Sequence, residues 1–182
     1  KDEEDARRKL EELRELARRD IERNKRELER LRREIEKDEE DNEEVIKRLR
    51  ERVEELRRRQ TDKDRAREVL EELKRLIDEL RRRNEETKEK LKRIIDEIRK
   101  RNEEMEERLR RIIEEIEKKL GREDESLKRL KEELEKLLRD YKKKLDDSDK
   151  ELRDLLAEYD DRLTRSDKRL RDLLKEAREK SK

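Results

Sequence analysis

Apolar residues recur along this chain at a fixed interval of 18 residues, and this period restricts the fold more than any other feature of the sequence. In residues 66–119, three consecutive blocks place Leu73, Leu91 and Leu109 at the same offset. Eighteen residues make about five turns of an α-helix, so the period returns the apolar stripe to the same side of a straight helix. A heptad repeat would instead drift by about 20° per heptad and require a left-handed supercoil. The period therefore predicts amphipathic helices that need no supercoil.

Three segments of the chain carry this period: residues 6–59, 66–120 and 127–180. At about 100° per residue, the apolar offsets of residues 66–120 fall within an arc of about 100°, the usual width of a stripe that faces a core. The first and third segments show the same arrangement with other residues, among them Leu10, Leu28 and Ile46, and Leu134, Leu152 and Leu170. Each segment is therefore expected to bury one face.

The composition alone is typical of a disordered chain, because 66% of the residues are charged and only 26% are hydrophobic. The regular apolar period argues against disorder. Long helices account for both the charged composition and the apolar period, since each can bury a narrow stripe while most of its side chains remain in water.

Two interruptions of the period have the chemistry of helix ends. Residues 60–65 are inserted between blocks, and Thr61 or Asp62 is a candidate N-cap. The second interruption contains Gly121, the only glycine, which suits a C′ position, followed by the candidate N-caps Asp124 and Ser126.

These interruptions predict helices over about residues 2–59, 62–120 and 124–180, each about 85 to 90 Å long at 1.5 Å per residue. Short loops between three helices require them to run up, down and up. The predicted fold is all-α: a single-chain antiparallel three-helix bundle of long, nearly straight helices, forming one elongated domain over residues 1–182. The pattern is compatible with either hand of the bundle.

A competing interpretation breaks the helices at residues 37–42, at residues 146–149, or before Asn84 and Asn102, which gives six or more short helices. Asn and Ser are good N-caps. However, a loop normally resets the helical phase, and the apolar stripe passes each of these points without a slip. Continuous helices are therefore favoured.

Several polar residues lie on the apolar stripes. Elsewhere on a helix a polar side chain indicates only contact with solvent, so these are the positions whose polarity needs an explanation. Folding the sequence at turns near residues 62 and 122 brings them level in two groups. The first group, called here the first polar layer, contains Asp20, Asn24, Asn102 and Tyr141. The second polar layer contains Asp38, Asn42, Asn84, Thr87 and Tyr159. Ser148 and Ser166 lie nearer the edge of the stripe.

The end blocks carry Ala6, Leu56, Ala66 and Ala177 at the equivalent offsets, so polarity is confined to the middle of the chain. Amide, carboxylate and hydroxyl groups can satisfy one another by hydrogen bonding across three helices. We interpret the layers as buried hydrogen-bond networks. The alternative is that they are boundary residues in contact with water.

Charge argues against nucleic acid and membranes as partners. The 61 basic and 60 acidic residues are mixed along the whole length, and no basic patch with stacking aromatics is present. No apolar run approaches the length of a membrane span or a secretory signal. Since the chain has no Cys, its redox compartment is undetermined.

We expect no enzyme activity, no cofactor and no metal. Each layer offers one Asp, and the chain has no His or Cys, whereas a metal site needs three or more such ligands. Acid and base catalysis by an Asp and a Tyr would also need a pocket of substrate size, which three closely packed helices are not expected to leave.

The exact repeats, the balanced Glu, Lys and Arg faces and the spaced Asn layers resemble designed helical bundles with buried hydrogen-bond networks, built from idealised helix geometry. The resemblance covers essentially the whole chain and implies a synthetic structural scaffold without a biological substrate. It also implies a soluble protein in the cytoplasm of an expression host. Such designs usually have more Gly, Ser, Pro or Asp in their loops than the first interruption has.

Two other functions stay open. The chain could be a designed subunit of a homo-oligomer, or a natural coiled-coil or spectrin-like spacer and interaction protein. A natural spacer would rarely keep an error-free period. An oligomer would need apolar residues on a second helix face, but Leu16, Ile21 and Ile46 lie within or beside the first stripe. A monomer that requires no partner is therefore expected.

Overall fold

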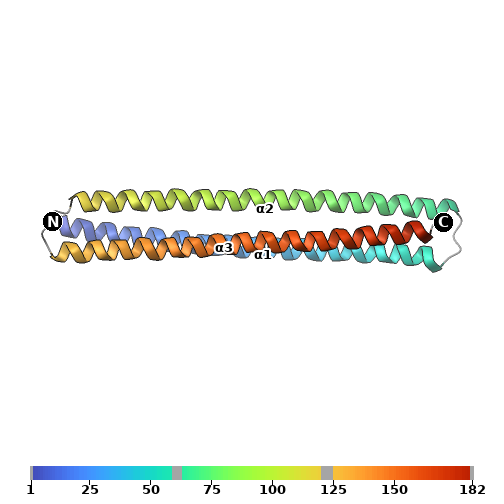
Figure 1. Cartoon of the computed structure of the whole chain (residues 1–182), viewed down its shortest axis with the longest axis horizontal. Helices are drawn as coiled ribbons and strands as arrows, with labels where there is room; N and C mark the ends of the chain where they lie inside the picture. Colours follow the sequence, from blue (N-terminus) through green and yellow to red (C-terminus); the bar gives the residue numbers. More distant parts are fainter. Residues whose placement is uncertain (1, 59–62, 120–124, 181–182) are drawn as a thin grey trace. The chain divides into compact units, whose positions relative to one another are not determined.

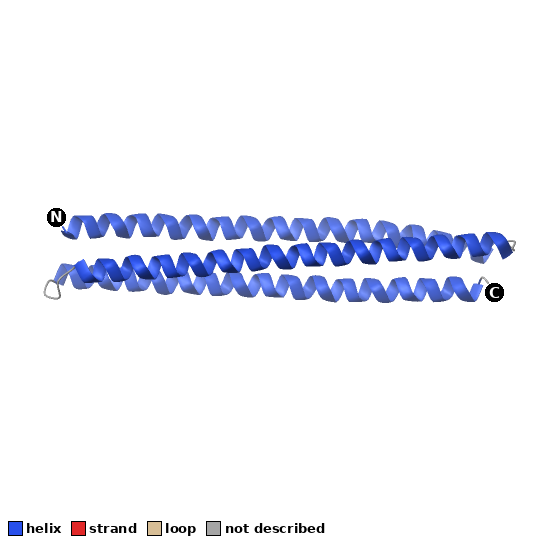
Figure 2. Ribbon diagram, turned by 90° about the horizontal axis from the view of Figure 1, so that it is seen from above, coloured by secondary structure: helices blue, strands red, loops and turns tan. Residues whose placement is uncertain are grey.

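The computed structural model describes residues 2–58, 63–119 and 125–180. Within these ranges the chain forms three α-helices, α1 (Asp2–Arg58), α2 (Lys63–Lys119) and α3 (Glu125–Lys180) (Figure 1). Every described residue is helical, as the view coloured by secondary structure also shows (Figure 2). The prediction of an all-α three-helix fold is confirmed.

The described helical ranges reach Arg58 in α1, span Lys63–Lys119 in α2 and begin at Glu125 in α3, and the residues between these ranges lie outside the described part of the chain. The proposed caps at Thr61, Asp62, Gly121 and Asp124 lie outside the described residues, as does the side chain of Ser126.

The segments that the competing interpretation made into loops are helical. Residues 37–42 lie within α1, residues 146–149 lie within α3, and α2 continues through Asn84 and Asn102. A residue that favours helix ends stops a helix only where the apolar pattern of the sequence is also interrupted. Here the apolar side chains on both sides keep the same phase, and their burial outweighs the weaker preference of Asn and Asp for helix ends.

The helices contribute to two compact units. Unit 1 comprises Lys1–Arg30 and Arg93–Asp154, and unit 2 comprises Leu31–Lys92 and Leu155–Lys182. Each unit contains part of α1, α2 and α3.

The core of unit 1 consists of the inward stripes of its three helix segments. Its most buried side chains include Leu13, Leu109, Ile116 and Leu134, each no more than 2% exposed. The buried cluster also contains Tyr141, which brings a hydroxyl group into the interior.

The core of unit 2 is built in the same way from Ile46, Leu49, Leu73, Ile77 and neighbouring residues. It also contains Ala66 and Ala177, where the sequence indicated a purely apolar layer. Small residues allow the helices to approach closely at that level.

Contacts between helices fix the direction of each segment. In unit 2, Arg81 pairs with Asp167 at 2.6 Å and Lys88 pairs with Asp160 at 2.5 Å, so residue numbers rise on α2 as they fall on α3. Tyr159 contacts Asp38 and Arg169 contacts Glu43, so α1 and α3 run in the same direction. This is the up-down-up arrangement that short connections require.

Candidate functional site

The first polar layer lies inside unit 1, where two of its hydrogen bonds join different helices. The Tyr141 hydroxyl on α3 donates to a carboxylate oxygen of Asp20 on α1. The Asn24 Nδ2 on α1 donates to the Asn102 Oδ1 on α2 at 2.9 Å. All four side chains are buried, with exposed fractions between 1% and 6%. The four residues that we predicted for this layer therefore meet in pairs.

The second polar layer lies inside unit 2 and uses Asp38 as its centre. The Tyr159 hydroxyl donates to the Asp38 Oδ2 at 2.6 Å, and the Asn42 Nδ2 donates to the same oxygen at 3.4 Å. Tyr159 is 1% exposed, whereas Asp38 is only partly buried. Thr87 donates from its hydroxyl to the backbone carbonyl of Arg83 one turn earlier, at 3.0 Å.

Asn84 does not join the hydrogen bonds of the second layer. Its side chain is buried, at 8% exposed, but it forms no hydrogen bond within the part of the chain that the structure describes, and its Oδ1 has no partner. Asn84 and Asn42, which we expected in the same layer, form no hydrogen bond with each other. Asn42 instead directs its amide nitrogen to Asp38 and accepts a hydrogen bond from Arg83 at 3.2 Å.

Arginines of α2 donate hydrogen bonds to both layers, and the sequence analysis did not predict them. Arg101 donates to the Asn24 Oδ1 at 3.3 Å and to Glu27 at 2.6 Å, while Arg83 donates to Asn42. Beside them, Arg99 pairs with Asp149 at 2.5 Å, as Arg81 does with Asp167. The signal was present, because 83 and 101, 81 and 99, and 149 and 167 each differ by the 18-residue period.

The two edge serines have different surroundings. Ser148 lines a cavity in unit 1 beside the first layer. The Ser166 hydroxyl, its equivalent in unit 2, is buried without a hydrogen-bond partner among the described residues.

The layers hold their tyrosines in the neutral form. Burial is the largest cause that raises the pKa of Tyr141 above its ordinary value of 10.0, and the hydrogen bond to Asp20 and the negative charge of that carboxylate add to it. Burial and Asp38 raise the pKa of Tyr159 in the same way, while a hydrogen bond with Thr87 acts in the opposite direction. Each tyrosine is therefore a stable hydrogen-bond donor to a carboxylate.

Over the described residues, no group of three or more His, Cys, Asp or Glu side chains is placed to hold a metal ion. Within the same ranges, none of the helices has an apolar stretch that could cross a membrane.

Three helices, each antiparallel to the next within a unit, define this chain as a three-helix bundle. A solved structure described as a "Computationally designed three helix bundle" has a similar fold, with a TM-score of 0.56 and 19% sequence identity over 98% of this chain and 90% of that chain. At this identity the likeness concerns the fold alone. No protein-family model matches the chain, and a search of curated proteins finds no relative.

Proposed function

We propose that this chain is a designed structural scaffold without a natural biochemical function, and that its two buried polar layers set the register and pairing of its helices. One observation carries the proposal. The same pair, a buried tyrosine donor on α3 and an aspartate acceptor on α1, occurs in both units at an offset of 18 residues on each helix. The flanking Arg99–Asp149 and Arg81–Asp167 pairs repeat at the same offset.

Apolar packing alone would identify the register poorly. Since each block presents nearly the same apolar offsets, a helix that slides by one block, about 27 Å, buries its stripe almost as well. The same slide brings only one of the two tyrosines level with an aspartate, because the pair repeats at the same 18-residue offset, and it leaves the other tyrosine and the other aspartate unpaired. The polar side chains can therefore distinguish registers that apolar packing treats alike.

Specificity is a better account of these residues than stability. A buried polar cluster contributes little net stability compared with apolar residues of similar volume, although breaking it by removing one partner is costly. The two polar layers replace some apolar contacts and so add little stability. They disfavour every misaligned state, however, since misalignment would leave the carboxylate or the phenol unpaired.

We further propose that the scaffold acts as a monomer, requires no partner and catalyses no reaction. No large hydrophobic side chain is exposed among the described residues, which favours a monomer over a subunit of a homo-oligomer. The extended apolar surface that a second copy would need is not offered by any described helix face.

The test is a variant in which both layers are made apolar at matched volume, with Asp and Asn replaced by Leu, Thr by Val and Tyr by Phe. It should keep its helicity and melting temperature but form a mixture of oligomers, measured by size-exclusion chromatography with light scattering. The matched control exchanges Leu49, Leu73, Leu80 and Leu170 for Ile, which changes the core but leaves the layers intact. The control should remain a monomer. An apolar variant that is also a clean monomer would show that the loops alone fix the register.

A further inference from the structure

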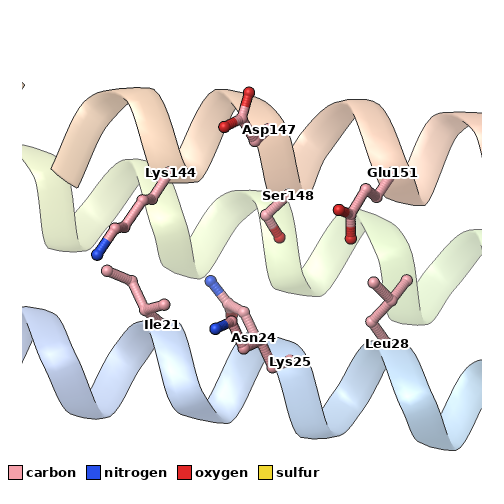
Figure 3. A pocket seen from close by; sticks show the side chains of 8 residues that line it. All are labelled: Ile21, Asn24, Lys25, Leu28, Lys144, Asp147, Ser148 and Glu151. Carbon is pink, nitrogen blue, oxygen red and sulfur yellow. The ribbon is translucent and has the colours of Figure 1, made fainter. Parts of the chain in front are cut away.

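A cavity of about 220 Å³ lies between α1 and α3 in unit 1, beside the first polar layer (Figure 3). Ile21 and Leu28 give it an apolar wall on α1, with Asn24 between them. From α3, Ser148 points toward α1 and reaches the cavity opposite Asn24. The cavity therefore combines apolar surface with two polar groups at its middle.

Asn24 has hydrogen-bonding capacity left over. Its Oδ1 accepts from Arg101, and its amide nitrogen donates to Asn102. A primary amide carries two N–H groups, so one donor of this buried side chain is free for another acceptor. The Ser148 hydroxyl can accept or donate as needed.

Unit 2 has the same serine and asparagine, as Ser166 and Asn42, but charged residues stand at other positions around them. Glu39 replaces Ile21, and Arg162 replaces Lys144, so that Arg162 and Glu39 form an ion pair from α3 to α1.

A second ion pair, Arg169 with Glu43 at 2.5 Å, crosses between the same two helices in unit 2. The equivalent residues of unit 1, Lys25 and Glu151, line the cavity without forming an ion pair within the described part of the chain. In unit 2 two ion pairs therefore connect α1 and α3 on this side, whereas the equivalent positions in unit 1 line the cavity.

We propose that this cavity is a binding site for a small neutral phenol. The ligand hydroxyl accepts a hydrogen bond from the free Asn24 N–H and donates one to the Ser148 Oγ, while its ring covers the methyl groups of Ile21 or Leu28. The volume is sufficient, because an apolar cavity of about 150 Å³ holds benzene. A rigid ring also buries apolar area with little loss of conformational entropy.

Charge at the rim favours a neutral molecule over an ion. Lys25 and Lys144 are balanced by Asp147 and Glu151, so the opening has no net preference for either sign. With so few atoms in contact, we expect a dissociation constant on the order of 1 mM.

The probe is 4-fluorophenol, followed by its fluorine NMR signal and by the backbone amide shifts of the full-length protein. Binding should shift amides at residues 21–28 and 144–151. The variant Ile21→Glu with Lys144→Arg copies the Arg162–Glu39 pair into unit 1 and should weaken binding at least tenfold. Its matched control, Lys142→Gln with Lys143→Arg, makes the same change of charge at exposed positions outside the cavity and should bind as the parent does.

Fluorobenzene should bind several-fold to about tenfold more weakly than 4-fluorophenol, because it lacks the hydroxyl group. Should the Ile21→Glu variant fail to fold, Ser148→Leu fills the cavity from α3 and should have the same effect on binding. The proposal is overturned by undiminished binding to a folded closed variant, by amide shifts centred elsewhere in the chain, or by no binding at about 10 mM probe. None of these outcomes depends on whether the layers set the register.

Discussion

Tyr159 donates a hydrogen bond of 2.6 Å to Asp38 across 121 positions of the sequence, and Tyr141 makes the same bond to Asp20 across the same separation. In both units the tyrosine is 1% exposed and donates to a carboxylate on the helix that runs parallel to its own. The two copies differ in the burial of the carboxylate and in the other groups that donate hydrogen bonds to it. This difference predicts that removing the two tyrosine hydroxyls will destabilise the protein unequally.

Tyr141→Phe should destabilise the protein more than Tyr159→Phe. Asp20 is 5% exposed and accepts its hydrogen bond from Tyr141, whereas Asp38 is only partly buried and also accepts from Asn42. A buried group left unsatisfied costs about 1 to 3 kcal/mol, so Tyr141→Phe should lie near the upper end and Tyr159→Phe near the lower. Chemical denaturation measures both. Adding Asp20→Leu to Tyr141→Phe should recover most of the loss; if it does not, the missing hydrogen bond is not the cause.

The asparagines of α2 should respond differently to the same substitution. Asn102 accepts from Asn24, so Asn102→Leu removes a buried partner and should cost about 1 to 3 kcal/mol. Asn84 makes no hydrogen bond with any described residue, so Asn84→Leu should be neutral or stabilising. Thermal unfolding of the two variants, compared at the same pH, distinguishes these outcomes. Equal destabilisation would mean that Asn84 joins its layer in solution.

High pH should unfold the protein through its tyrosines. Because the fold raises the pKa of Tyr141 and Tyr159 above their ordinary 10.0, their contribution to stability is complete below about pH 10 and is lost as the pH rises further. Tyrosinate absorbance should therefore appear together with loss of helicity. The double variant Tyr141→Phe with Tyr159→Phe is the control, and its stability should fall less steeply in this range. Tyrosinate formation in a fully helical protein would contradict the expectation.

Truncation of core leucines should show how far burial on the stripe determines stability. Leu134 is fully buried in unit 1, and Leu134→Ala should cost about 2 to 5 kcal/mol through lost contact and the cavity it leaves. Leu138, one turn later on α3, is only partly buried, and Leu138→Ala should cost less. Urea denaturation provides the comparison. Similar losses would mean that the two positions are packed alike.

The 18-residue period was sufficient to predict the fold class, because a single repeated offset specifies helix, phase and buried face at once. It also brought Asn24 to the level of Asn102, which the structure joins by a hydrogen bond. The period could not predict that Asn42 turns to Asp38 instead of Asn84, since that choice depends on side-chain rotamers and on competition from Arg83.

The arginines beside the layers were missed for a related reason. Arg81, Arg83, Arg99 and Arg101 are four of 61 basic residues, and nothing in their own identity separates them from solvated neighbours. Only comparison of the two units, block against block, distinguishes them.

The wide sequence separation of the tyrosine and aspartate pairs has a consequence for how the chain folds. Closing a loop of 121 residues instead of the 78 between Asn24 and Asn102 costs only about 0.4 kcal/mol more chain entropy, since the cost grows with the logarithm of length. Loop length alone therefore gives little preference for which helix packs on α1 first, so α3 can dock before α2 has fixed its level. A misdocked α3 must release its buried stripe before it can move, so correction requires partial unfolding and should appear as a slow refolding phase that grows when the tyrosines are replaced by phenylalanine.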